Sequence, residues 1–78
     1  MNNFNQFSKE QTDFLVYCIE MYKNTYLLSG TATQELFSKS GADLYILNNF
    51  GALHTTGLEY TMSDIHDFIK QKSKSVTK

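Results

Sequence analysis

The most chemically suggestive segment is Leu53-His54-Thr55-Thr56-Gly57, which sets an imidazole beside two hydroxyl groups. A histidine acts as a general base only when a nucleophile or an orienting acid lies within hydrogen-bond reach, and no motif for either accompanies His54. Threonine hydroxyls next to a glycine commonly satisfy the backbone groups of a turn. The segment therefore predicts a capped turn, and His54 is kept as a candidate contact for a partner.

Asp64, His66 and Asp67 bring two carboxylates and an imidazole into four residues. Helix neighbours three apart share a face, so Asp64 and Asp67 are adjacent while His66 points elsewhere. Acids in a first helical turn normally complement the helix dipole. We therefore expect no metal site, no cofactor and no catalytic residue. Cys18, the only cysteine, falls among apolar residues and is expected to be buried rather than nucleophilic.

Three residues of the stretch 9–25 are the best candidates for a partner contact: Asp13, Tyr17 and Glu20. They fall on the polar side of a predicted helix, where an aromatic ring is out of place. Tyrosine is enriched in interface hot spots because it buries a large area at low entropic cost. Two alternatives stay open. Tyr17 could lie across its neighbours, and Glu20 could turn inward toward a loop hydroxyl, where its loss would affect stability rather than binding.

The stretch 9–25 is the clearest predicted helix. Ser8 followed by Gln11 forms a capping box, and Phe7 can staple onto the first turn. Apolar residues then recur at helical spacing and form one wide stripe that we expect to face the core. Its members are Phe14, Leu15, Cys18, Ile19 and Tyr22.

A second helix is expected over 32–39. Thr31 with Gln34 repeats the capping signature, and Gly41 is placed to adopt the left-handed conformation just past the C-terminus. The core residues of this helix are expected to be Leu36 and Phe37.

The apolar run within 43–49 permits two interpretations, because periodicity cannot distinguish a short strand from a buried helix. We favour a helix, since the flanking segments are helical and no other segment offers a good partner strand. The side chains expected to face inward are Leu44 and Leu47, together with Tyr45 or Ile46.

The last helix is expected to begin at Ser63, as N-cap, with Asp64 in its first turn. Before it, 52–56 is expected to form one helical turn and 58–62 to be extended or irregular. The core stripe of this helix is expected to be Ile65, Phe68 and Ile69.

A chain of 78 residues makes one domain. We predict an all-α fold, a small bundle of four to five short helices over 8–70. A flexible N-terminus at 1–7 and a frayed basic tail at 71–78 flank it. All eight acids and three of the lysines lie in 1–69, which gives −5, whereas the four remaining lysines give the last nine residues +4.

Several classes are disfavoured by composition. No arginine occurs, and arginine is the usual residue for bidentate phosphate and guanine contacts, so nucleic acid is a disfavoured partner. No apolar stretch is long enough to span a bilayer, and the N-terminus lacks the pattern of a signal peptide. We therefore expect no membrane association and a cytoplasmic location.

The alternative function is a small helix-turn-helix DNA-binding regulator, because 33–47 follows that motif's spacing with Gly41 at the turn. A recognition helix should present polar or basic side chains to the major groove. This one offers Asp43 and bulky apolar groups, so the motif's physical requirement fails.

Four segments together resemble a small bacterial family, domain of unknown function 3791. They are 14–22, Ser29-Gly30 through Leu36-Phe37, 53–57, and Asp64-Ile65 with Phe68-Ile69, and they cover most of 10–70. The resemblance implies a bacterial or mobile-element cytoplasmic protein, with no established activity and no defined functional residues. It also implies gene neighbours that resemble ADP-ribosyltransferase toxins, and hence an antitoxin or accessory role.

The leading hypothesis is a non-enzymatic protein-protein interaction module, antitoxin-like or an accessory factor of a toxin, conflict or mobile-element locus. Its partner would be a neighbouring toxin or a second copy of the chain, and the acidic body would meet a basic surface. An enzyme is disfavoured because so short a chain leaves little room for a convergent polar pocket.

Overall fold

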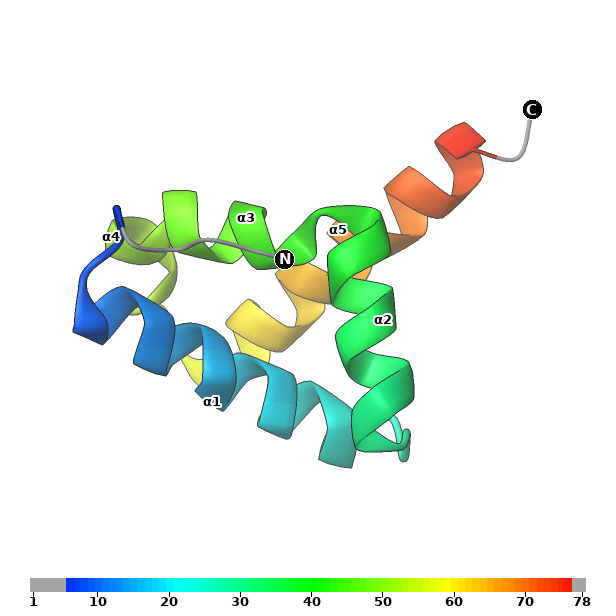
Figure 1. Ribbon diagram of the computed structural model, residues 1–78, viewed down its shortest axis with the longest axis horizontal. Coiled ribbons are helices and arrows are strands. Elements are labelled where there is room, and N and C mark those ends of the chain that lie inside the picture. Colours follow the sequence, from blue (N-terminus) through cyan, green and yellow to red (C-terminus); the bar gives the residue numbers. More distant parts are fainter. Residues whose placement is uncertain (1–5, 77–78) are drawn as a thin grey trace.

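The described part of the chain, residues 6–76, forms five helices in a computed structural model (Figure 1). They are α1 (Lys9–Thr25), α2 (Gly30–Ser40), α3 (Ala42–Asn48), α4 (Phe50–Leu53) and α5 (Leu58–Val76). No strand occurs among these residues, so the predicted all-α fold is confirmed and the strand alternative for 43–49 is wrong. Side chains are described through residue 72.

The start of α1 is fixed by the predicted capping box. The Oγ of Ser8 accepts the backbone N–H of Gln11 at 3.1 Å, and the Oε1 of Gln11 accepts the N–H of Ser8 at 2.8 Å. The Nε2 of Gln11 also donates to the carbonyl of Leu47 at 3.0 Å, which ties this end of α1 to α3. The predicted core stripe is confirmed. Leu15, Cys18 and Tyr22 are buried, and Phe7, Phe14 and Ile19 are partly buried against them.

The end of α1 is closed in a left-handed turn by a residue other than glycine. The N–H of Leu28 donates to the carbonyl of Lys23 at 2.9 Å, the long-range bond of a Schellman motif. Leu27 occupies the position where such motifs usually place glycine, with φ at +56° and 90% of the residue exposed. A Cβ in this conformation costs roughly 1–2 kcal/mol.

Leu27→Gly is expected to raise the free energy of unfolding by about 1 kcal/mol, because it removes the left-handed penalty and gives up almost no buried area. In a domain of this size, that gain corresponds to about 4–8 °C in Tm. Thermal denaturation measures it, and Leu27→Asn, which tolerates the same conformation, is the matched second variant. A loss of stability in both variants would show that the Leu27 side chain stabilises the turn.

The helix α2 begins earlier than the capping signature predicted. Ser29 is the N-cap, and its Oγ accepts the N–H of Ala32 at 3.1 Å. The predicted capping box of Thr31 with Gln34 is therefore wrong, because a serine two residues upstream already satisfies the open N–H groups. Gly41 adopts φ +82° after the last residue, as predicted, and connects α2 directly to α3.

The helix α3 is confirmed, but its core face differs from the prediction. Ile46 and Leu47 are fully buried, whereas Leu44 is 47% exposed, so the prediction that Leu44 faces inward is wrong. Ala42 is also fully buried, and a residue two positions later lies on the opposite side of a helix. The half-buried ring of Tyr45 stacks on Phe68 of α5 at 4.3 Å.

The helix α5 begins earlier than predicted. The carbonyl of Gly57 accepts the N–H of Thr61 at 3.0 Å, so helical bonding is already present where an irregular stretch was expected. The predictions of an irregular 58–62 and of Ser63 as N-cap are wrong, because Thr61 and Met62 are buried in the helix and Ser63 is an exposed residue within it. The single turn expected over 52–56 is α4, a few residues earlier.

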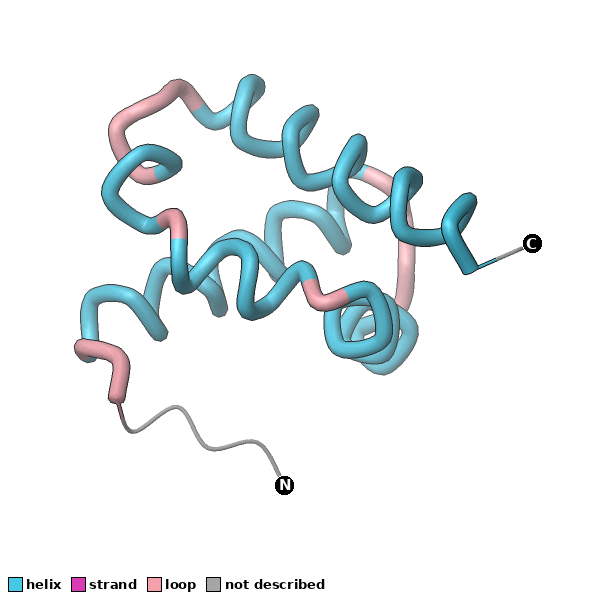
Figure 2. Tube along the Cα trace, turned by 90° about the horizontal axis from the view of Figure 1, so that it is seen from above, coloured by secondary structure: helices cyan, strands magenta, loops and turns pink. Residues whose placement is uncertain are grey.

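The five helices enclose one core. The helices α1 and α3 run in opposite directions, and α2 crosses at one end of both (Figure 1). The helix α5 contacts all three and lies along one side of the molecule when seen from above (Figure 2). The largest fully buried side chains are Phe37, Ile46, Leu47, Ile65, Thr33 and Cys18.

The structure describes more of the C-terminal end of the chain than was expected to be ordered. The predicted flexible N-terminus falls mostly on residues 1–5, which lie outside the described residues, as do 77–78 at the other end. The helix α5 continues through 71–76 and projects beyond the bundle (Figure 1). Fraying of this basic segment stays a prediction.

Candidate partner-binding surface

The outer face of α1 carries three of the four predicted contact residues. Tyr17 is 47% exposed, and Val16 beside it is 64% exposed. Asp13 pairs with Lys9 at 2.8 Å, and Glu20 pairs with a neighbouring lysine at 3.1 Å. Both carboxylates are largely exposed, so the alternative in which Glu20 turns inward is wrong. Exposed pairs of this kind contribute little to stability, and the acids stay accessible to a partner.

The fourth predicted residue, His54, lies near this face because α4 brings it to the ring of Phe14. The rings of Phe14 and Tyr17 are 6.4 Å apart, and Phe50 meets Phe14 edge-on at 5.5 Å. His54 stacks on Phe50 at 4.2 Å and meets Phe14 edge-on at 6.5 Å. We call Tyr17, Phe14, Phe50 and His54 the aromatic ridge. The sequence analysis named Tyr17 and His54 as contact residues, whereas the partly buried Phe14 and Phe50 that connect them were not proposed for a surface.

A hydrogen bond to the backbone fixes the tautomer of His54. Its Nδ1 lies 2.7 Å from the carbonyl oxygen of Phe50, and a carbonyl only accepts, so Nδ1 carries a proton. The neutral ring then presents Nε2 as an acceptor. The backbone carbonyl of Phe50 therefore fixes the orientation of the imidazole ring.

The neighbouring threonines confirm the predicted capped turn. Thr55 donates to the carbonyl of Ala52 at 3.0 Å, and Thr56 donates to the carbonyl of Leu53 at 2.7 Å. The buried hydroxyl of Thr61 donates to the same Leu53 carbonyl at 3.2 Å. These hydroxyls donate to backbone carbonyls at the end of α4, so their role is to stabilise the fold.

Asp64, His66 and Asp67 do not converge as a set of metal ligands. His66 points away from the acids, as predicted, with Nδ1 2.9 Å from the hydroxyl of Tyr22 and its ring stacked on Tyr26 at 4.6 Å. Asp64 instead accepts the hydroxyl of Tyr45 at 2.7 Å, and this bond raises the pKa of Tyr45. Within the described residues, no three His, Cys, Asp or Glu side chains gather as metal ligands.

Cys18 lies at the centre of α1 with no exposed surface. Burial raises the pKa of its thiol to about 12, because the core cannot solvate a thiolate. At neutral pH the group is a small apolar core residue, as predicted, and it takes no part in the surface.

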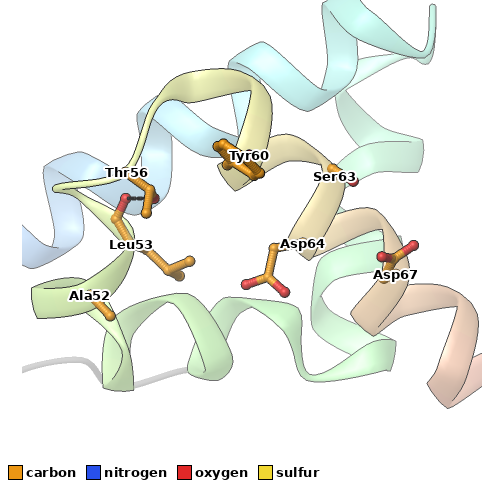
Figure 3. Close-up of a pocket in the computed structure, with 7 residues that line it drawn as sticks. All are labelled: Ala52, Leu53, Thr56, Tyr60, Ser63, Asp64 and Asp67. Atoms are coloured by element: carbon orange, nitrogen blue, oxygen red, sulfur yellow. Dashed lines mark hydrogen bonds between the residues drawn. The ribbon is translucent and has the colours of Figure 1, made fainter.

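A second surface feature lies between α4 and α5 and was missed by sequence reasoning. Figure 3 shows an open groove between Leu53 and the outer side of α5, where Tyr60, Asp64 and Asp67 line it. Tyr60 is 77% exposed. Helical spacing of 60, 64 and 67 would have indicated this face if the last helix had been started at Leu58.

These features define a class of protein: a small all-helical domain with a partly exposed aromatic ridge flanked by acids. The chain belongs to the family described as Protein of unknown function (DUF3791), whose family model matches residues 13–72. The match confirms the resemblance carried by the four segments of the sequence. No curated protein and no solved structure matches the chain.

Among the helices of residues 6–76, even the 19-residue α5 lacks a stretch long and apolar enough to cross a membrane.

Proposed function

We propose that this protein is a non-enzymatic module that binds a partner protein through the aromatic ridge and the acids beside it. The observation that supports this most directly is the continuity of the ridge. A half-exposed tyrosine on α1 connects through two phenylalanines to an exposed histidine at the end of α4. Aromatic groups of this kind bury much area at low entropic cost, and they dominate binding energy in many interfaces.

The charge around the ridge favours a basic partner surface. Asp13 and Glu20 lie on the same outer face of α1 as Tyr17, and each pairs with a lysine of its own helix, the exposed Lys9 and the partly buried Lys23. A partner lysine or arginine can replace those weak pairs and also lie over an aromatic ring. Positive potential on the partner would speed association and set orientation.

The biological setting is part of the proposal. We propose a bacterial or mobile-element protein of the cytoplasm, which is the setting that the family resemblance implies. Within that setting we propose an antitoxin-like or accessory role, in which the ridge masks a functional surface of the product of a neighbouring gene. Helix-turn-helix DNA binding gains no support from α3, whose exposed side includes the apolar Leu44.

Capture of a partner by the full chain tests the proposal. The tagged protein is incubated with lysate of its native host and, separately, with the purified product of the adjacent gene. Tyr17→Ala is expected to weaken binding by about 10- to 100-fold, the loss typical of a hot-spot tyrosine. Glu20→Ala is expected to weaken binding without lowering Tm, because its carboxylate is exposed.

Tyr60→Ala is the matched control, since it removes an even more exposed tyrosine from a different helix. We expect it to leave capture of the partner unchanged. Equal retention of the partner by the Tyr17 and Tyr60 variants would contradict the ridge as the binding surface. A failure to find any protein partner, with the adjacent gene product included, would contradict the function itself.

A further inference from the structure

The charges along α5 are divided by position. Its acids Glu59, Asp64 and Asp67 all precede its lysines, which begin at Lys70 and Lys72. More lysines follow toward the end of the chain. One continuous helix therefore carries an acidic first half and a basic second half.

The outer side of α5 is left uncovered by the rest of the bundle. Tyr60, Asp64, Asp67 and Lys70 are all exposed, and their spacing of three and four residues places them along one side of the helix. The same side borders the groove against α4 (Figure 3). We call these four residues the outer stripe.

Within the described part of the chain, the acids of the outer stripe form no ion pair with Lys70, although Asp67 lies only three residues before it. The helix is continuous from Leu58 to Val76, so the basic end cannot fold back onto the acidic end. Within residues 6–72, where side chains are described, neither Asp64 nor Asp67 forms an ion pair with a lysine. The body of the chain, with −5 over 1–69, adds to the negative potential that a basic segment would meet.

We propose that the outer stripe is an interface at which α5 pairs antiparallel with α5 of a second copy of this chain. Antiparallel pairing sets the acidic half of each helix against the basic half of the other, whereas parallel pairing would oppose like charges. A two-fold axis between Asp67 and Lys70 makes the contact reciprocal, with Asp67 of each copy facing Lys70 of its partner.

The shape of the molecule agrees with this arrangement. The C-terminal part of α5 projects beyond the bundle, which leaves this part of the helix uncovered by the other helices (Figure 1). The interface is separate from the aromatic ridge, so this inference does not depend on the proposed function. Association also stabilises a small domain by mass action.

Sedimentation equilibrium of the full chain tests the pairing. At low salt, about 0.02 M, we expect twice the monomer mass of 9.0 kDa at high protein concentration. At about 0.5 M salt we expect the association constant to fall at least about tenfold, because exposed ion pairs are screened. A mass that stays at 9.0 kDa at low salt would overturn the proposal.

Charge reversal makes the test specific. The double variant Asp64→Lys with Asp67→Lys is expected to be monomeric, and so is the variant Lys70→Glu. A mixture of the two is expected to form a heterodimer, because each then supplies the charge that the other lacks. Tyr45→Phe is the control for the hydrogen bond lost at Asp64, and we expect it to dimerise like the natural chain. Dimers that persist in both charge variants alone would also overturn the proposal, since they would need another interface.

Discussion

Leu47→Ala is expected to lower the free energy of unfolding by about 3–5 kcal/mol, enough to unfold much of the population of a domain this small. Leu47 has no exposed surface, so truncation leaves a cavity as well as removing apolar contact area. It also belongs to α3, a helix of 7 residues. So short a helix depends on tertiary packing rather than on its own stability.

Leu44→Ala is the matched control, because it makes the same change in the same helix at a residue that is 47% exposed. Its expected loss is under about 1 kcal/mol, since little transfer free energy and no cavity are involved. Urea titration followed by far-UV circular dichroism measures both variants. Equal losses for the two would mean that Leu44 faces the core, as its sequence first indicated.

The wrong prediction for Leu44 shows that an apolar run does not reveal which of its residues face the core. Residues 44–47 are all apolar or aromatic, so any helical face looks equally suitable for the core. The face of α3 that is buried is determined by the surrounding structure. Ala42 is buried directly after the left-handed Gly41. The ring of Tyr45 stacks on Phe68, and its hydroxyl donates to Asp64. These contacts join segments far apart in the chain, and local spacing carries no information about them.

The apolar spacing of the sequence indicates the true start of α5, but the N-cap preference of Ser63 indicates a later one. Leu58, Met62, Ile65 and Ile69 follow helical spacing, which extends the predicted core stripe upstream by two turns. Ser63 is a favourable N-cap residue, and the prediction therefore placed the start of the helix there. A serine on the exposed side of a helix is tolerated at small cost, so cap preference alone does not fix a boundary.

The candidate surface was predictable in part for the same reasons. Periodicity on α1 placed Asp13, Tyr17 and Glu20 outside correctly, because a helix with a clear capping box fixes every side-chain direction along it. The link from Phe14 to Phe50 and His54 was not predictable. It depends on how α4 turns back toward α1 after α3.

Alkaline pH is expected to unfold this protein in part through Cys18. The pKa of the buried thiol is raised from 9.0 to about 12, so the folded chain keeps a proton that the unfolded chain releases above pH 9. The associated stability is complete below pH 9 and is lost as the pH rises toward 12. The free energy of unfolding should fall by about 1.4 kcal/mol per pH unit in that window, and by at most about 4 kcal/mol in all.

Two tyrosines act in the same direction. Burial raises the pKa of Tyr22, and the bond to Asp64 raises that of Tyr45, so each also stabilises the folded state until the pH rises above 10. Cys18→Ala keeps both tyrosines and removes only the thiol. Urea titrations of the two proteins should therefore give parallel pH profiles below pH 9 and diverge above it, with the variant falling less steeply.

The divergence, rather than the absolute stability, isolates the thiol, because Cys18→Ala also leaves a small cavity that lowers stability equally at every pH. The same burial predicts that a thiol reagent modifies Cys18 only as fast as the chain opens. Denaturant should accelerate that reaction in proportion to the unfolded population. Profiles that stay parallel up to pH 11, or immediate modification of the native protein, would show that water reaches Cys18 and that the core around α1 is looser than its packing indicates.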